Sequence, residues 1–200
     1  NKVNTNTMIR TKDMTKVAML SVIGFVLMYS QLPLTFVAPP FMKLDISDLP
    51  VLMGAFTMGP VYGIIIAGLK NLMHIIFKGT MTAGVGELSN FIISSTFALV
   101  SSYIYRKHRT YKGAVLSMTV GVVAMTILAM ASNYFVVFPL YGKVMPMDAI
   151  IAMGSAITPK ITGLFTMMIY SVLPFNLIKG FTTSAVMMLV YKKISPLFKN

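Results

Sequence analysis

The stretch LPFNLIKGFTTSAVMMLVY, residues 173–191, is long and apolar enough to cross a membrane as a helix. One basic residue, Lys179, lies inside it, three positions after Asn176. A lysine at the centre of a membrane helix costs roughly 2.5–3.5 kcal/mol on insertion scales. The stretch therefore predicts a membrane helix. The cost of placing Lys179 in it must be offset by residues around its side chain.

The composition of the whole chain agrees with a membrane protein. The 200 residues are 56% hydrophobic and 11% charged, whereas about a quarter of a soluble domain is charged. The chain has five acidic residues, two histidines and no cysteine, which excludes disulfides, thiolate metal sites and cysteine nucleophiles. No Ser-His-Asp set can be assembled, so we expect neither an enzyme, nor a metal site, nor a cofactor.

The apolar runs predict an all-α, polytopic fold with six membrane spans in a single domain, residues 1–200. The first run follows a basic flank, as in a signal peptide, but its exit QLPLTFVAPP lacks the small-x-small cleavage pattern. Gly59-Pro60 separates the second and third spans by a tight turn. Prolines and glycines interrupt residues 136–172, so we expect there a long outer loop with short helices. The spans are expected at about 14–32, 49–58, 60–77, 87–105, 113–135 and 174–191.

The net charge of +12 is explained by membrane topology rather than by nucleic-acid binding. With both termini in the cytoplasm, most basic residues fall at the termini, including Lys2, Arg10 and Lys199, or in the 106–112 loop. This is the positive-inside pattern of membrane proteins. The outer loops then hold only Lys43, Lys78, Lys143 and Lys160.

The remaining polar residues gather at one predicted level, the outer ends of the spans. Asn176 and Lys179 share a helix face because they are three residues apart. Such residues predict an outward-opening pocket with amides, one ammonium and carboxylates. They are Asp45, Asp48, Glu87, Asn90, Asn133, Asn176 and Lys179.

Each of these residues also has a structural interpretation. Lys179 could extend its ammonium to the outer interface, and Asn133 and Asn176 could join helices by hydrogen bonds. Glu87 could simply favour the positive end of a helix dipole, and Asp48 could cap a helix. The clustering at one depth favours a binding site over these separate interpretations.

Two further polar residues, Lys70 and His74, lie four apart on one face of the third predicted span. Neither a second nearby histidine nor a carboxylate at a fixed spacing indicates a metal site. We expect these two residues to hydrogen-bond to neighbouring helices or to lie at the outer rim of their helix.

Several motifs together resemble one family. The segments FMKLDISDLPVLMGAFTMGPVYGIIIAGLKNLMHIIF, GVGELSNFI, NYFVVFPLY and LPFNLIKG resemble the riboflavin-specific S component of energy-coupling-factor (ECF) transporters. The resemblance implies a six-helix, multi-pass protein of the bacterial plasma membrane that captures riboflavin at the extracellular side. It also implies partners: a transmembrane coupling subunit and two cytoplasmic ATPase subunits that drive uptake. An S component for another vitamin or heterocycle is the alternative.

The resemblance also implies which residues bind the flavin. Asn133, Asn176 and Lys179 would hydrogen-bond the carbonyl and nitrogen edge of the ring. The KLDISD and GVGELSN segments would cover or line the site, with some of their polar residues on the ribityl hydroxyls. The residues expected from these two segments are Leu44, Asp45, Gly84, Glu87 and Asn90.

Two other surfaces are expected. Aromatic residues close to the site in sequence could pack on the ring. S components commonly present Ala-x-x-x-Ala on the first span for packing on the coupling subunit. The nearest match here is Ala18 and Val22, and Val22 departs from the small residue of that pattern. The aromatic candidates are Phe36, Phe41, Tyr134, Phe135 and Phe138.

Overall fold

The computed structural model describes residues 11–80 and 82–194. The fold is all-α apart from one two-stranded antiparallel ribbon, in which Leu32 pairs with Leu44. The basic residues Lys2, Arg10 and Lys199, expected in the cytoplasm, lie outside the described residues. The elements in chain order are α1 (Thr11–Tyr29), β1 (Leu32–Pro33), β2 (Lys43–Leu44), α2 (Asp48–Thr57), α3 (Pro60–Lys78), α4 (Val85–Lys107), α5 (Tyr111–Ser132), η1 (Asn133–Val137), α6 (Phe138–Val144), α7 (Met147–Ser155), α8 (Leu164–Met167), η2 (Met168–Val172) and α9 (Leu173–Ile194).

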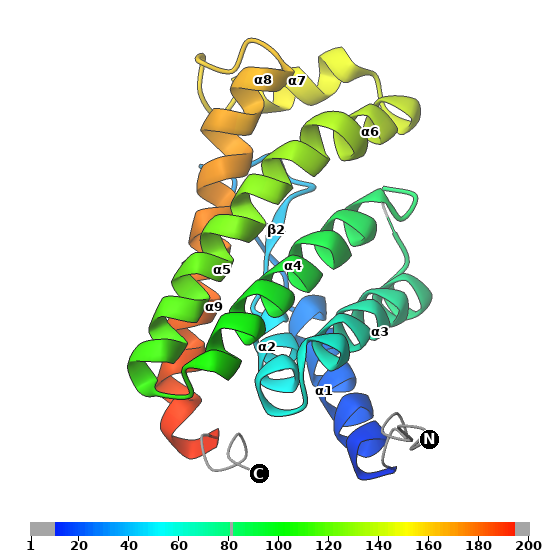
Figure 1. The fold of residues 1–200 in the computed structure, drawn as a ribbon. Coiled ribbons are helices and arrows are strands. Elements are labelled where there is room, and N and C mark those ends of the chain that lie inside the picture. Colours follow the sequence, from blue (N-terminus) through cyan, green and yellow to red (C-terminus); the bar gives the residue numbers. More distant parts are fainter. Residues whose placement is uncertain (1–10, 81, 195–200) are drawn as a thin grey trace, which may run out of the picture.

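The long helices lie side by side in a bundle (Figure 1). α4 packs against α3 and α5, α5 packs against α9, and the short α2 lies among α1, α3 and α4. The beginning of α1, the α4–α5 connection and the last turns of α9 lie at one end of the molecule (Figure 1). The short helices α7 and α8 cover the opposite end of the bundle (Figure 1).

The helices around residues 136–172 are longer than the sequence indicates. A continuous helical segment runs from Tyr111 to Val144, and another begins at Leu164 and reaches the end of α9. The irregular connection is therefore confined to the residues between Val144 and Leu164, and it contains α7.

Two prolines explain this difference. Each is accommodated by a π-helical turn and therefore does not end its helix. Pro139 and Pro174 each follow a π-helical turn, η1 and η2 respectively. A proline ring clashes with the carbonyl four residues earlier and lacks an N–H. A π-turn at that point increases the local radius and lets the helix continue.

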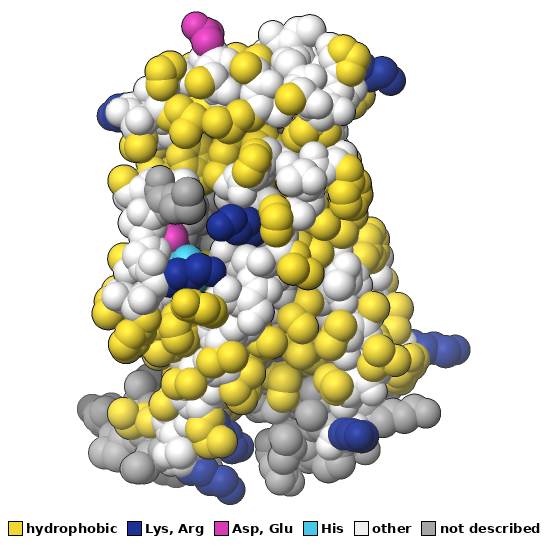
Figure 2. Space-filling view, turned by 180° about the vertical axis from the view of Figure 1, so that it is seen from behind, with side chains coloured by type: hydrophobic (Ala, Val, Ile, Leu, Met, Phe, Trp, Pro, Cys, Tyr) yellow, Lys and Arg dark blue, Asp and Glu magenta, His cyan; other side chains and the backbone are white. Residues whose placement is uncertain are grey.

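Four helical segments are long and apolar enough to cross a membrane, judged by length and composition. They are Pro60–Lys78, Val85–Lys107, Tyr111–Val144 and Leu164–Tyr191. α2 has only 10 residues, and the first turns of α1 carry Lys12, Asp13 and Lys16. The rear view shows hydrophobic side chains along the flank and basic side chains at both ends (Figure 2).

Small residues bring the helices close together, as in other membrane bundles. A Cβ built on Gly180 of α9 would lie 2.7 and 2.8 Å from the two methyl groups of Val122 on α5. A Cβ on Gly63 of α3 would lie 2.7 Å from the Cβ of Ala55 on α2. These contacts set the spacing of the helices that surround the central cavity.

Candidate functional site

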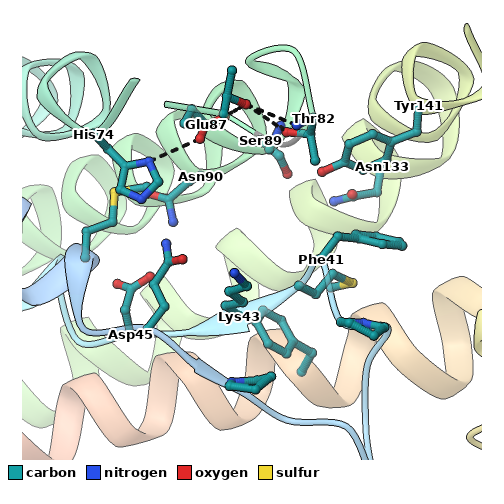
Figure 3. Close-up of a pocket in the computed structure, with 18 of the residues that line it drawn as sticks. Phe41, Lys43, Asp45, His74, Thr82, Glu87, Ser89, Asn90, Asn133 and Tyr141 are labelled. Atoms are coloured by element: carbon teal, nitrogen blue, oxygen red, sulfur yellow. Dashed lines mark hydrogen bonds and ion pairs between the residues drawn. The ribbon is translucent and has the colours of Figure 1, made fainter. Parts of the chain in front are cut away.

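A cavity of about 840 Å³ lies between the helices and the segment that joins α1 to α2. Its size suits a ligand of drug-like dimensions. The close-up shows His74, Asn90 and Asp45 on one side and Asn133, Tyr141 and Phe41 on the other (Figure 3). The wall comes from the segment after α1, the end of α3 with the loop that follows it, the beginning of α4, the end of the 111–144 helix, and α7 and α9, and it combines apolar with polar side chains.

Three asparagines line the cavity, and for Asn133 and Asn176 their own helices fix the orientation of the amides. Asn133 Nδ2 donates to the carbonyl of Ala129 at 2.7 Å, and Asn176 Nδ2 donates to that of Val172 at 2.8 Å. A carbonyl can only accept, so these contacts leave the amide oxygens as acceptors. Asn176 Oδ1 is buried and has no hydrogen-bond partner among the described residues.

Asn90 presents the opposite group. Its Oδ1 accepts hydrogen bonds from Asn71 Nδ2 at 3.3 Å and from Ser94 Oγ at 3.2 Å. Its Nδ2 is then left as a donor, and Figure 3 shows that nitrogen directed toward the cavity. These amides therefore offer both hydrogen-bond acceptors and donors to a ligand in the cavity.

Lys179 lies against two carboxylates. Its Nζ is 3.6 Å from Asp45 Oδ2 and 3.5 Å from Asp48 Oδ2. Lys70 Nζ donates to Asp48 Oδ1 at 2.6 Å. We call Asp45, Asp48, Lys70 and Lys179 the buried charge cluster, because all four side chains are almost inaccessible. Its two positive and two negative charges balance, which makes their burial tolerable.

A second polar group forms one edge of the cavity. His74 Nδ1 and Glu87 Oε1 are 3.1 Å apart, and Thr80 Oγ1 donates to Glu87 Oε2 at 3.0 Å. Lys78 lies nearby and donates to the backbone carbonyl of Tyr29 at 2.8 Å. In the rear view, basic, acidic and histidine side chains meet in a hollow midway along the flank (Figure 2).

The structure brings together six of the eight residues expected to bind the ligand. The other two, Leu44 and Gly84, do not belong to the described lining: Leu44 pairs in the ribbon with β1, and Gly84 precedes α4 with φ 85°. Ala18 and Val22 lie on α1 beside Met19 and Ile23, away from the cavity. The six lining residues are Asp45, Glu87, Asn90, Asn133, Asn176 and Lys179.

The contacts of these residues differ from most of the purely structural roles that the sequence allowed. Lys179 is buried in an ion-pair cluster and does not extend to an interface. Asn133 and Asn176 bond within their own helices rather than between helices. Asp48 is the first residue of α2 and pairs with Lys70 instead of capping the helix. Glu87 does lie in the first turn of α4 and is paired as well.

The depth of Lys179 differs from the expected one. The sequence places it in the first turns of the last span, but the helix begins at Leu164, so Lys179 lies midway to Ile194. Two carboxylates, and not proximity to the outer interface, therefore offset the cost of burying its charge.

Sequence reasoning identified some neighbours and missed others. Lys70 and His74 do hydrogen-bond to other helices, as expected. The pairing of Lys70 with Asp48 across 22 residues was missed, because no local pattern links the two. Of the aromatic candidates only Phe41 lines the cavity, joined by Tyr141. Phe138 is buried in the core, and Phe36, Tyr134 and Phe135 are exposed.

Within residues 11–80 and 82–194, no group of three histidine, aspartate or glutamate side chains could hold a metal ion. The chemistry available at the cavity is therefore hydrogen bonding, charge and apolar contact. Such a set can bind a flat, partly polar organic molecule.

Comparison with known proteins gives one consistent result. The family described as "ECF transporter, substrate-specific component" matches residues 12–191. "Riboflavin transporter RibU" of Staphylococcus aureus (strain TCH60) is 35% identical over 191 residues, which are 96% of this chain and 94% of the relative. "Riboflavin transporter FmnP" of Bacillus subtilis (strain 168) is 32% identical over 188 residues, 94% of each chain.

A solved structure agrees with these relatives. A chain described under "Structure and mechanism of the S component of a bacterial ECF transporter" superposes with a TM-score of 0.74 at 34% sequence identity. The match covers 94% of this chain and 98% of that one. The similarity thus extends over the helices, the cavity and the segment that covers it.

Proposed function

The chain belongs to the ECF transporter substrate-specific component family, and on this premise we propose that its cavity binds riboflavin for import. The family is a substrate-binding transporter component and not an enzyme, and the chain is a multi-pass protein of the bacterial plasma membrane. The observation that carries the proposal is the cavity itself. It is large, mainly apolar and equipped with a few oriented donors and acceptors.

Riboflavin has a flat, largely apolar ring with a polar edge and a hydroxylated ribityl tail. On the polar edge an N–H lies between two carbonyl groups, so the edge needs one acceptor flanked by donors. Asn176 Oδ1 offers an acceptor, and the second amide N–H of Asn133 and the ammonium of Lys179 offer the two donors. We assign these three residues to the ring edge, because amides and ammonium match its donor and acceptor order.

The ribityl tail needs groups that both donate and accept. We assign Asp45, Glu87 and Asn90 to its hydroxyls, because all three line the cavity and come from different segments. Leu44 lies between the lining residues Lys43 and Asp45, and Gly84 lies two residues from Thr82 and Gly86; their proposed role is to shape the covering segments. Phe41 and Tyr141 supply the aromatic surface for the ring.

The proposal extends to topology and partners. We propose six membrane spans in one domain, formed by the four apolar segments together with α1 and α2. Both termini would lie in the cytoplasm, with the α6–α8 connection outside. Family membership implies an energising module as partner, for which we propose a coupling subunit and two ATPase subunits. The exposed surface at Ala18 and Val22 would pack on the coupling subunit.

The decisive experiment is a titration of riboflavin with the purified, flavin-depleted protein in detergent. Binding should quench riboflavin fluorescence at one ligand per chain, and protein purified from cells should be yellow. A tenfold excess of thiamine or biotin serves as the control and should not restore the fluorescence. Colourless protein that leaves riboflavin fluorescence unchanged would overturn the proposal in favour of another substrate.

A further inference from the structure

The buried charge cluster contains two residues that do not line the cavity. Lys179 and Asp45 lie in its wall, whereas Asp48 and Lys70 lie behind them with 1% and 0% of their surface exposed. Burying an ion inside a membrane protein is costly even when it is paired. A second ion pair behind a binding site therefore needs a reason beyond packing.

Each carboxylate of the cluster divides its two oxygens in the same way. Asp48 Oδ1 accepts from Lys70 Nζ and from Ser94 Oγ, and Asp48 Oδ2 is turned to Lys179. Asp45 Oδ1 accepts from the backbone N–H and the hydroxyl of Ser47, and Asp45 Oδ2 is turned to Lys179. Lys70 also donates to Ser47 Oγ at 2.6 Å, so it acts on both carboxylates.

This division leaves Lys179 loosely held. Its ammonium lies 3.5 and 3.6 Å from the two carboxylate oxygens, whereas a full ammonium–carboxylate hydrogen bond is about 2.7–2.9 Å long. The two carboxylates thus hold the N–H groups of Lys179 at more than the usual length of such a bond. These N–H groups remain available to a ligand in the cavity.

Lys70 is itself firmly placed. Gly24 of α1 packs against its stem, since a Cβ on that glycine would lie 3.4 Å from both Cβ and Cδ of Lys70. Its ammonium is held by Asp48 and Ser47. The side chain can therefore fix the carboxylates without moving when a ligand enters.

We propose that Lys70 is a positioning residue for ligand binding, which holds Lys179 at the cavity wall by occupying one oxygen of Asp48 and, through Ser47, one of Asp45. The inference rests on the proposed function, because riboflavin is the ligand used to test it. Without Lys70, Asp48 Oδ1 keeps only the Ser94 hydroxyl, and the uncompensated carboxylate draws the Lys179 ammonium into a direct hydrogen bond. Lys179 then turns away from the ligand.

A double-mutant cycle separates this role from a merely structural one, because residues that act through one another are not additive. Lys70→Met should weaken riboflavin binding by about tenfold or more in the otherwise unchanged chain. In a Lys179→Met background, the same substitution should change the affinity by less than about twofold. Equal losses in the two backgrounds would show that Lys70 only supports the fold, and would overturn the inference.

A second test restores the charge balance of the cluster. Lys70→Met combined with Asp48→Asn removes both members of the rear pair and leaves Lys179 balanced by Asp45 alone. Affinity should return to within about threefold of the unchanged chain, since nothing then draws Lys179 toward α2. An affinity as low as that of Lys70→Met would contradict the mechanism. Where Lys70→Met yields no monodisperse protein, Lys70→Gln, which also removes the charge but keeps a polar end group, takes its place in the cycle, with the same non-additivity expected.

The controls identify which claim fails. Lys107→Met removes an exposed charge at the far end of α4 and should leave the affinity unchanged. Absence of riboflavin binding by the unchanged chain would overturn the proposed function and this inference with it. Binding by the unchanged chain with additive losses would overturn the inference alone.

Discussion

The amide of Asn176 shows how a single residue is prepared for a ligand. Its Nδ2 is used within the helix, on the carbonyl of Val172, so the side chain cannot rotate freely. Its Oδ1 is buried without a partner among the described residues. An unpaired buried acceptor costs about 1–3 kcal/mol, which a ligand N–H would recover on binding.

Asn176→Ala should therefore weaken riboflavin binding by about tenfold, since it removes a buried acceptor that the ligand satisfies. The fold should be retained, because the lost protein contact lies within one helix. Fluorescence titration gives the affinity and the apparent melting temperature in detergent gives the stability. Thr119→Ala is the matched control, because it also removes a bond to a carbonyl four residues earlier, but at an exposed position of α5. Equal affinities of the two variants would remove Asn176 from the site.

The candidate site was partly predictable at this scale. Asn133, Asn176 and Lys179 could be selected because polar residues in apolar helices have few other uses. Their partners could not be selected, because Asp48 and Lys70 meet only when α2 and α3 pack together. Leu44 lies outside the lining for a related reason: it follows the lining residue Lys43 in β2, and neighbouring strand residues point to opposite faces.

At the scale of elements, two amides of the cavity wall lie at or just after the π-turns η1 and η2. Asn133 is the first residue of η1, and Asn176 follows η2 after one helical turn. Each π-turn rotates the residues that follow it relative to a regular helix. π-turns occur frequently at functional sites, and here both precede a proline.

The π-turns also explain why the helices in residues 136–172 could not be predicted from the sequence. Proline inside an apolar run ordinarily indicates a helix end, so residues 136–172 were expected to be a long loop. A π-turn is set by the packing of its neighbours and has no simple pattern in a single sequence. The Gly59-Pro60 turn, in contrast, was predictable, because glycine followed by proline has few other conformations.

Gly59 offers a test of that turn. Its φ of 125° and ψ of 166° are accessible almost only to glycine. Gly59→Ala should cost about 1–3 kcal/mol, and a protein of this size loses about 2–4 °C in melting temperature per kcal/mol. The control is Gly68→Ala inside α3, where a Cβ would lie at an ordinary 3.6 Å from Phe91 and alanine favours the helix. The turn would not be strained if both variants melted at the same temperature.

At the scale of the whole molecule, the helical bundle has two ends of different character. The beginning of α1, the α4–α5 connection and the end of α9 share one end, and α7 and α8 close the other (Figure 1). Basic residues are frequent at the first end, where Arg106, Lys107, Arg109 and Lys112 lie within a few residues. Such an excess marks the cytoplasmic side of a membrane protein.

The chain contains no cysteine, so single cysteines can report this orientation without background labelling. Lys160→Cys lies in the connection before α8, and Lys112→Cys lies in the first turn of α5; both positions are exposed. In intact cells an impermeant maleimide should label the first and not the second, because the positive-inside pattern predicts that the basic end lies in the cytoplasm. After permeabilisation both should react. Labelling of Lys112→Cys alone in intact cells would reverse the orientation, and would place the α7–α8 end of the molecule in the cytoplasm.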